Sequence, residues 1–105
     1  MKSINVQELK SMIDKKEDFK LIDVREQHEY DFANLGAELI PVSQVANNID
    51  KFPKDKKVVV HCRSGARSGQ VILYLESSLG YDNLYNLEGG ILAWSDQIDA
   101  SVPKY

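Results

Sequence analysis

Three consecutive valines, Val58 to Val60, constrain the fold of this chain more than any other stretch. β-branched side chains favour strands, and a strand without polar positions is typical of a parallel sheet that is buried on both faces. We therefore predict a central strand over residues 57–61, in a sheet that has helices on both sides.

The other elements are predicted to alternate between strands and helices through short connections, as in a three-layer α/β domain. The first helix has a well-marked start, because Asn5 and Glu8 have the spacing of a capping box, and Ile4 and Leu9 that of a hydrophobic staple. Gly80 suits the left-handed position that follows a helix. The expected strands are 19–24, 38–42, 57–61 and 83–87, and further helices are expected over 27–32 and 68–79, from Ser43 and from Ile91.

Composition narrows the possible functions. A length of 105 residues predicts one domain, residues 1–105, and 13 basic against 16 acidic residues give a net charge of -3. Such a charge does not attract nucleic acid or an anionic membrane, and no apolar run approaches the roughly 18 residues that span a bilayer. One cysteine excludes an intrachain disulfide, and the isolated histidines lack the spacing of metal ligands. We expect a cytoplasmic protein that uses no metal or other cofactor.

Cys62 directly follows the central strand, where ligands bind in open α/β sheets. The residues after it are small or basic: Arg63, Ser64, Gly65, Ala66, Arg67, Ser68 and Gly69. Small residues let successive N–H groups turn inward, and a helix N-terminus adds about half a positive charge. This setting lowers the pKa of a thiol from about 8.5 to between about 3.5 and 7.5. A lone cysteine is more often a buried hydrophobe, but this loop favours a reactive thiolate.

Loop length separates two kinds of chemistry at such a cysteine. Cysteine-dependent phosphatases resemble one another in a cysteine, five further residues and then an arginine that clamps phosphate oxygens. In this chain the arginine comes one place earlier, at Arg67, and Ser68 stands where the phosphatase arginine would be. Phosphatase and arsenate chemistry are therefore disfavoured.

Three stretches follow in order along the chain: LIDVREQHEY (21–30), VVVHCRSGARS (58–68) and LEGGILAW (87–94). Together they resemble the first conserved segment, the active-site loop and the closing segment of single-domain rhodaneses, which are sulfurtransferases. The resemblance implies a small α/β fold around a parallel five-stranded sheet, with a persulfide on Cys62 during turnover. The connection 34–37 departs from the His-Ile-Pro-Gly-Ala that most relatives carry, which leaves its geometry open.

The loop Cys62 to Arg67 is similar to that of thiosulfate-type members, whereas mercaptopyruvate-type relatives usually carry an uncharged loop. The resemblance therefore favours a dianionic donor such as thiosulfate. We expect Arg67 to bind the donor and the backbone amides of residues 63–68 to cradle it. Arg63 could share that role or point outward and select a protein partner, and both interpretations stay open.

Asp23 and Arg25 end the first predicted strand at the same edge of the sheet. Either they brace the loop, or they form an ordinary surface ion pair worth at most about 1 kcal/mol. His61 is expected to be packed at its strand end, since a thiolate stabilised by the loop needs no general base. His28 is expected to be solvated.

Thiosulfate is the expected donor, and cyanide, a thiol or a protein is the expected acceptor. With no second cysteine, a persulfide on Cys62 cannot be resolved as an internal disulfide and must pass to an outside acceptor. Two alternatives remain: a persulfide or selenium carrier that serves a partner protein, and a regulatory rhodanese-like binding module. The second is disfavoured, because such modules commonly lack the cysteine.

Overall fold

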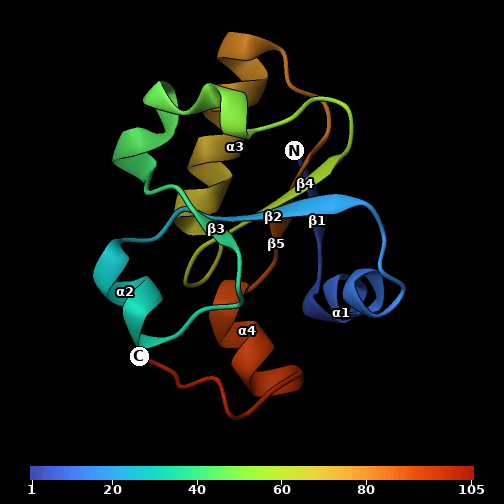
Figure 1. The fold of residues 1–105 in the computed structure, drawn as a ribbon, viewed down its shortest axis with the longest axis vertical. Coiled ribbons are helices and arrows are strands. Elements are labelled where there is room, and N and C mark those ends of the chain that lie inside the picture. Colours follow the sequence, from blue (N-terminus) through green and yellow to red (C-terminus); the bar gives the residue numbers. More distant parts are fainter.

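The computed structural model describes all residues from Met1 to Tyr105. A five-stranded sheet with the order β1-β5-β4-β2-β3 forms its centre, and every pair of neighbouring strands is parallel. Figure 1 shows the helices around this sheet. The elements are β1 (Lys2–Ile4), α1 (Val6–Asp14), β2 (Phe19–Asp23), α2 (Gln27–Phe32), β3 (Glu38–Leu39), the 3-10 helices η1 (Val42–Asn47) and η2 (Ile49–Lys51), β4 (Lys57–His61), α3 (Ala66–Leu79), β5 (Leu84–Leu87) and α4 (Gly90–Gln97).

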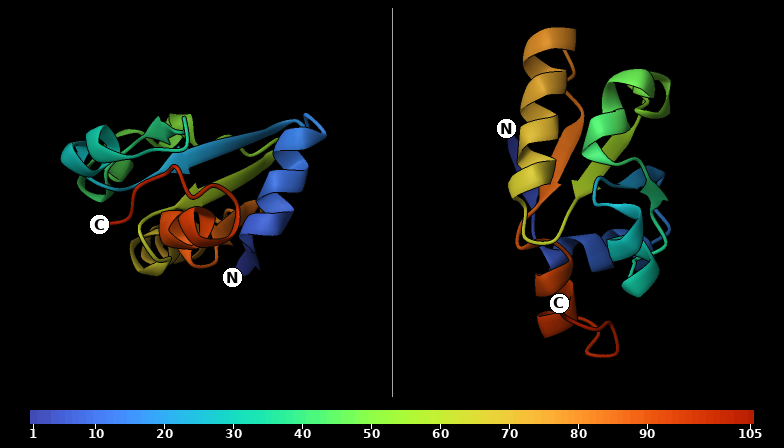
Figure 2. Two further views of the ribbon diagram at one scale, coloured as in Figure 1. Left: turned by 90° about the horizontal axis from the view of Figure 1, so that it is seen from below. Right: turned by 90° about the vertical axis from the view of Figure 1, so that its left-hand side faces the viewer.

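The valines of β4 pack into two hydrophobic cores, one on each face of the sheet. Val58 and Val60 pack with residues of α3, η1 and β2, whereas Val59 packs with residues of α1, β5 and α4. The two further views in Figure 2 show α3 on one side of the sheet and α1 with α4 on the other. The prediction of a three-layer α/β domain around a parallel five-stranded sheet is confirmed. No helix combines the length and the apolar character that crossing a bilayer requires.

Local signals predicted several helix ends correctly. The Asn5 side chain accepts from the Glu8 N–H at 2.8 Å, and the Glu8 carboxylate accepts from the Asn5 N–H at 3.1 Å, which completes the capping box. Gly80 ends α3 with a φ of 70°, in the left-handed region where glycine carries no steric cost.

Other boundaries were wrong. Strand β1, which includes Ile4, was missed because Ile4 was interpreted only as the residue before the N-cap of the first helix. The strand expected over 38–42 ends at Leu39, and η1 begins at Val42 with no side-chain cap from Ser43. Helix α3 begins at Ala66 rather than near Ser68, so Arg67 lies in its first turn.

Candidate active site

Cys62 lies between the end of β4 and the start of α3, and only 1% of the residue is exposed. Gly65 closes the loop with a φ of 110°, a left-handed conformation that residues with a Cβ rarely adopt. In this conformation the Gly65 N–H donates to Cys62 Sγ at 3.1 Å. The Ser68 hydroxyl, on the first turn of α3, lies 3.4 Å from the same sulfur.

Two opposing effects set the acidity of Cys62. Burial raises the pKa of the thiol, because it disfavours the charged form. The Ser68 hydroxyl and the backbone N–H groups of Ser68, Gly65 and Ser64 lower that pKa by hydrogen bonding to the thiolate. The hydrogen bonds outweigh burial, so the pKa of Cys62 lies below its ordinary value. The loop favours a thiolate in a site shielded from water.

The Gly-Gly turn before α4 holds the outer side of the loop. The N–H groups of Ile91 and Leu92 donate to the carbonyl oxygens of Cys62 and Arg63, at 3.0 and 3.2 Å. Gly90 has a φ of 56°, and a Cβ added there would lie 2.5 Å from both of those oxygens. Only glycine fits this close approach, which fastens the two loop carbonyls to the start of α4.

Asn86, in the middle of β5, braces the loop from a second side. Its side-chain amide donates to the Gly65 carbonyl at 3.0 Å, and its oxygen lies 2.6 Å from the Ser68 hydroxyl. The Asn86 oxygen and the Cys62 sulfur thus share the single proton of that hydroxyl as acceptors. The sequence analysis missed this residue. The available signal was an asparagine inside a short strand, where that residue type is depleted.

Arg67 is already paired. Its two terminal nitrogens donate to the two carboxylate oxygens of Glu29 on α2, at 2.7 and 2.8 Å. Glu29 is buried, yet its pKa lies well below its ordinary value, chiefly because of the hydrogen bonds from Arg67. The sequence analysis assigned no role to Glu29, and its neighbour His28 is exposed as expected.

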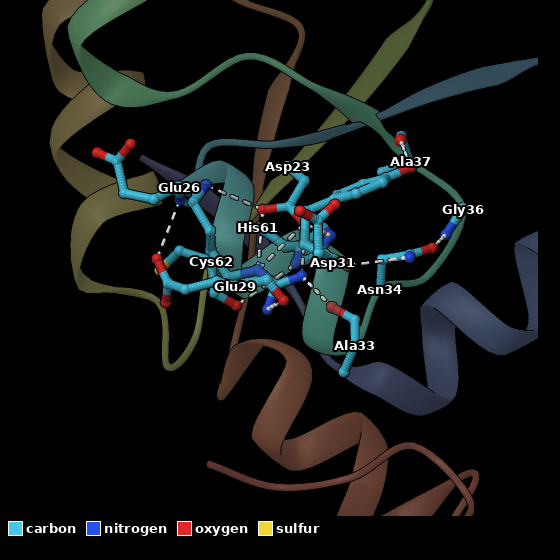
Figure 3. Close-up of polar contacts among 12 residues, drawn as sticks. Asp23, Glu26, Glu29, Asp31, Ala33, Asn34, Gly36, Ala37, His61 and Cys62 are labelled. Atoms are coloured by element: carbon cyan, nitrogen blue, oxygen red, sulfur yellow. Dashed lines mark hydrogen bonds and ion pairs between the residues drawn. The ribbon is translucent and has the colours of Figure 1, made fainter.

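Asp23 and Arg25 are completely buried, so the surface ion pair considered as an alternative is wrong. Arg25 donates to Asp23 through Nε at 3.0 Å and Nη2 at 2.8 Å, and Nη2 also donates to the Ala33 carbonyl at 2.7 Å. Figure 3 shows Asp23, Glu29 and Ala33 gathered within this network. The pair therefore fastens β2 to α2, the helix that carries Glu29.

His61 is packed at the end of β4 and has no exposed surface. Burial lowers its pKa and the Arg25 charge adds to this, whereas Asp23 and the Cys62 carbonyl act in the opposite direction. Its Nε2 has no hydrogen-bond partner and lies 3.6 Å from Asp23 Oδ2. The neutral, enclosed ring agrees with the expected structural role.

Arg63 is exposed, and its Nε donates to the main-chain oxygen of Tyr105 at 2.8 Å. Tyr105 is, after Asn86 and Glu29, a third residue that the sequence analysis missed, since nothing in the local pattern of residues 99–105 points to the loop. Elsewhere, no group of three or more His, Cys, Asp or Glu side chains is arranged to hold a metal ion.

Comparison with known proteins identifies the family of this chain. The model of the rhodanese-like domain matches residues 5–97. The chain belongs to the rhodanese-like domain family. A sulfurtransferase of Allochromatium vinosum is 41% identical over 85 residues, which cover 75% of this chain and 74% of that protein. This rhodanese-like chain is thus homologous to small sulfurtransferases.

Solved structures agree with the family assignment. The crystal structure of a rhodanese-like domain protein from Staphylococcus aureus has a TM-score of 0.83 and 33% identity, and covers 100% of this chain and 99% of that one. The "Probable adenylyltransferase/sulfurtransferase MoeZ" of Mycobacterium tuberculosis is 32% identical over 98% of this chain. The rhodanese-like chain spans 27% of the length of MoeZ.

Proposed function

We propose that residues 1–105 act as one sulfur-transfer domain, in which Cys62 carries a persulfide between a donor and an acceptor. The observation that carries this proposal is the setting of the Cys62 thiol. Its buried sulfur accepts a hydrogen bond from the Gly65 N–H at 3.1 Å, and its pKa is lowered. A thiolate with inward-facing donors can act as a nucleophile and can also hold the anionic persulfide that follows.

The proposed first half-reaction uses thiosulfate. The Cys62 thiolate attacks the outer sulfur, the sulfur–sulfur bond of thiosulfate breaks, and its electron pair leaves with sulfite. One thiolate and one dianion thereby give one persulfide anion and one sulfite dianion, so charge and atoms balance. The loop N–H groups that surround Sγ offset the repulsion between the two anions as they approach.

The proposed second half-reaction returns the enzyme to its thiolate. Cyanide, a thiol or a protein thiolate attacks the terminal sulfur of the persulfide, and the electron pair of the broken bond returns to Cys62. Since Cys62 is the only cysteine, no internal disulfide competes with this step. Two separated half-reactions of this kind give ping-pong kinetics.

The arginine contacts favour a second candidate, a persulfide or selenium carrier that uses thiosulfate poorly. Arg67 is paired with Glu29, and Arg63 is in contact with Tyr105. The loop therefore presents less free positive charge to a dianion than its sequence indicates. Transfer of sulfur from a persulfidated partner protein needs less positive charge in the loop than binding of a dianion does.

Mass spectrometry separates these two functions. The enzyme proposal expects a gain of one sulfur atom on Cys62 after incubation with thiosulfate, and no gain in Cys62→Ser. A gain only when a persulfidated protein is offered would favour the carrier. Cleavage of an aryl phosphate without any uptake of sulfur would overturn both.

A further inference from the structure

The segment 102–105 folds back from α4 toward the active-site loop. The Ser95 hydroxyl on α4 donates to the Val102 carbonyl at 2.6 Å, and Lys104 forms an ion pair with Asp96. Figure 1 shows the chain running from the far end of α4 to the vicinity of α2. These contacts bring Tyr105 to the rim of the loop.

The Tyr105 side chain is held on three sides. Its hydroxyl donates to Glu29 Oε2 at 2.7 Å and accepts from Arg25 Nη1 at 2.9 Å. Its ring meets the Phe32 ring edge-on, with centroids 5.8 Å apart. The hydroxyl thus joins the buried Asp23–Arg25 pair to the carboxylate that holds Arg67.

Arg63 is the loop cation that Tyr105 covers. Its Nε and Nη2 both donate to the Tyr105 main-chain oxygen, and its guanidinium lies 5.2 Å from the centre of the Tyr105 ring. Arg63 is exposed, whereas Arg67 is only partly exposed and is held by two hydrogen bonds to the buried Glu29 carboxylate. An anion from solvent can therefore displace the partners of Arg63 more readily than it can displace Glu29 from Arg67.

We propose that Tyr105 controls the access of anionic donors to the active site by occupying Arg63 until a donor displaces it. This inference rests on the proposed sulfur transfer. It identifies Tyr105 as the residue that sets the preference between anionic and uncharged donors. A dianion such as thiosulfate competes for the Arg63 guanidinium, and the Tyr105 ring and main-chain oxygen move aside. An uncharged donor gains nothing from that exchange and reaches Cys62 without it.

Replacement of Tyr105 tests the proposal. Tyr105→Ala removes the cation–π contact and both hydroxyl hydrogen bonds that keep the main-chain oxygen beside Arg63. The KM for thiosulfate should fall by about fivefold or more, the amount expected from losing one exposed cation–π contact and about one hydrogen bond. Tyr105→Phe, which keeps the ring over Arg63, should change the KM less.

The fall in KM caused by Tyr105→Ala must depend on Arg63. In an Arg63→Ala background the substitution Tyr105→Ala should leave the KM for thiosulfate unchanged, because the cation that it frees is absent. Phe32→Ala is a second variant that poses little risk to folding, since Phe32 is 54% exposed. It removes the edge contact with Tyr105 and should lower the KM in the same direction, by a smaller factor. An unchanged or raised KM in both Tyr105→Ala and Phe32→Ala overturns the proposal.

A binding measurement separates this proposal from the proposed function. Calorimetry with thiosulfate on Cys62→Ser, with and without Tyr105→Ala, reads donor affinity without any chemistry. Tighter binding in the double variant supports the control by Tyr105 even if Cys62 never gains sulfur. Equal or weaker binding overturns it, whatever the outcome of the sulfur-transfer assay.

Discussion

Arg67 and Glu29 face each other as a two-point ion pair, with nitrogen–oxygen distances of 2.7 and 2.8 Å. The pair joins the first turn of α3 to α2, and Glu29 contributes an almost fully buried carboxylate. Arg67 is therefore a structural cation of the loop as well as a candidate for donor binding.

Glu29→Gln should lower the free energy of unfolding at neutral pH by about 1–3 kcal/mol, because it replaces a charged, hydrogen-bonded partner. The folded-state pKa of Glu29 lies well below the ordinary glutamate value of about 4.5, chiefly because of the hydrogen bonds from Arg67. The stabilisation is therefore complete above about pH 4.5 and is lost as the pH falls toward the lower folded-state value. Denaturant titrations from neutral to acidic pH should show that the free energy of unfolding falls less steeply in Glu29→Gln than in the unmodified protein. The exposed substitution Glu17→Gln is the control, and an equal acid response in all three proteins would contradict the prediction.

The Cys62 thiolate should form at a lower pH than a free cysteine thiol, whose pKa is about 8.5. Ultraviolet absorbance of the thiolate against pH measures this midpoint, with Cys62→Ser as the blank. Ser68→Ala removes the hydroxyl 3.4 Å from the sulfur and should raise the midpoint. A wild-type midpoint at or above that of free cysteine would be evidence against the proposed nucleophile.

Gly90→Ala should damage the site, whereas Gly80→Ala should not. Both glycines have positive φ, so either substitution costs about 1–2 kcal/mol in backbone strain. A Cβ at Gly90 would also lie 2.5 Å from the carbonyl oxygens of Cys62 and Arg63, but one at Gly80 meets nothing within 4 Å. We expect Gly90→Ala to lose persulfide formation, measured by mass spectrometry, and Gly80→Ala to retain it. Equal activity in the two variants would show that the contact with α4 does not shape the loop.

Arg25→Met should destabilise the fold by about 3–5 kcal/mol, because it leaves the buried Asp23 carboxylate unpaired. The double variant Asp23→Asn with Arg25→Met should cost less than Arg25→Met alone, since no uncompensated charge remains. Denaturant unfolding of the two single variants and the double variant completes the cycle. A loss below about 1 kcal/mol in Arg25→Met would be typical of a surface pair and would contradict the buried arrangement.

Features set by neighbours in the chain were predictable from the sequence. The valine run of β4, the capping box of Asn5 and Glu8, and the glycine after α3 each depend on residues a few positions apart. Strand β1 was missed because three residues carry too little periodicity to distinguish a strand from a helix start, and its partner is the distant β5.

The surroundings of Cys62 were only partly predictable for the same reason. The small residues of the loop indicated inward-facing amides, and the Gly65 N–H does donate to the sulfur. The residues that hold the loop, Glu29, Asn86 and Tyr105, lie 24 to 43 positions away from Cys62 in the chain. Their contacts with the loop form only when the sheet is assembled, so no local sequence pattern predicts them.

The hydrogen bonds from Ile91 and Leu92 to the loop make the site dependent on residues that follow it in the chain. These two N–H groups lie 29 positions after the carbonyls of Cys62 and Arg63 to which they donate. A fragment that stops before α4 would therefore lose both supports of the loop, although every residue that contacts the Cys62 sulfur would still be present.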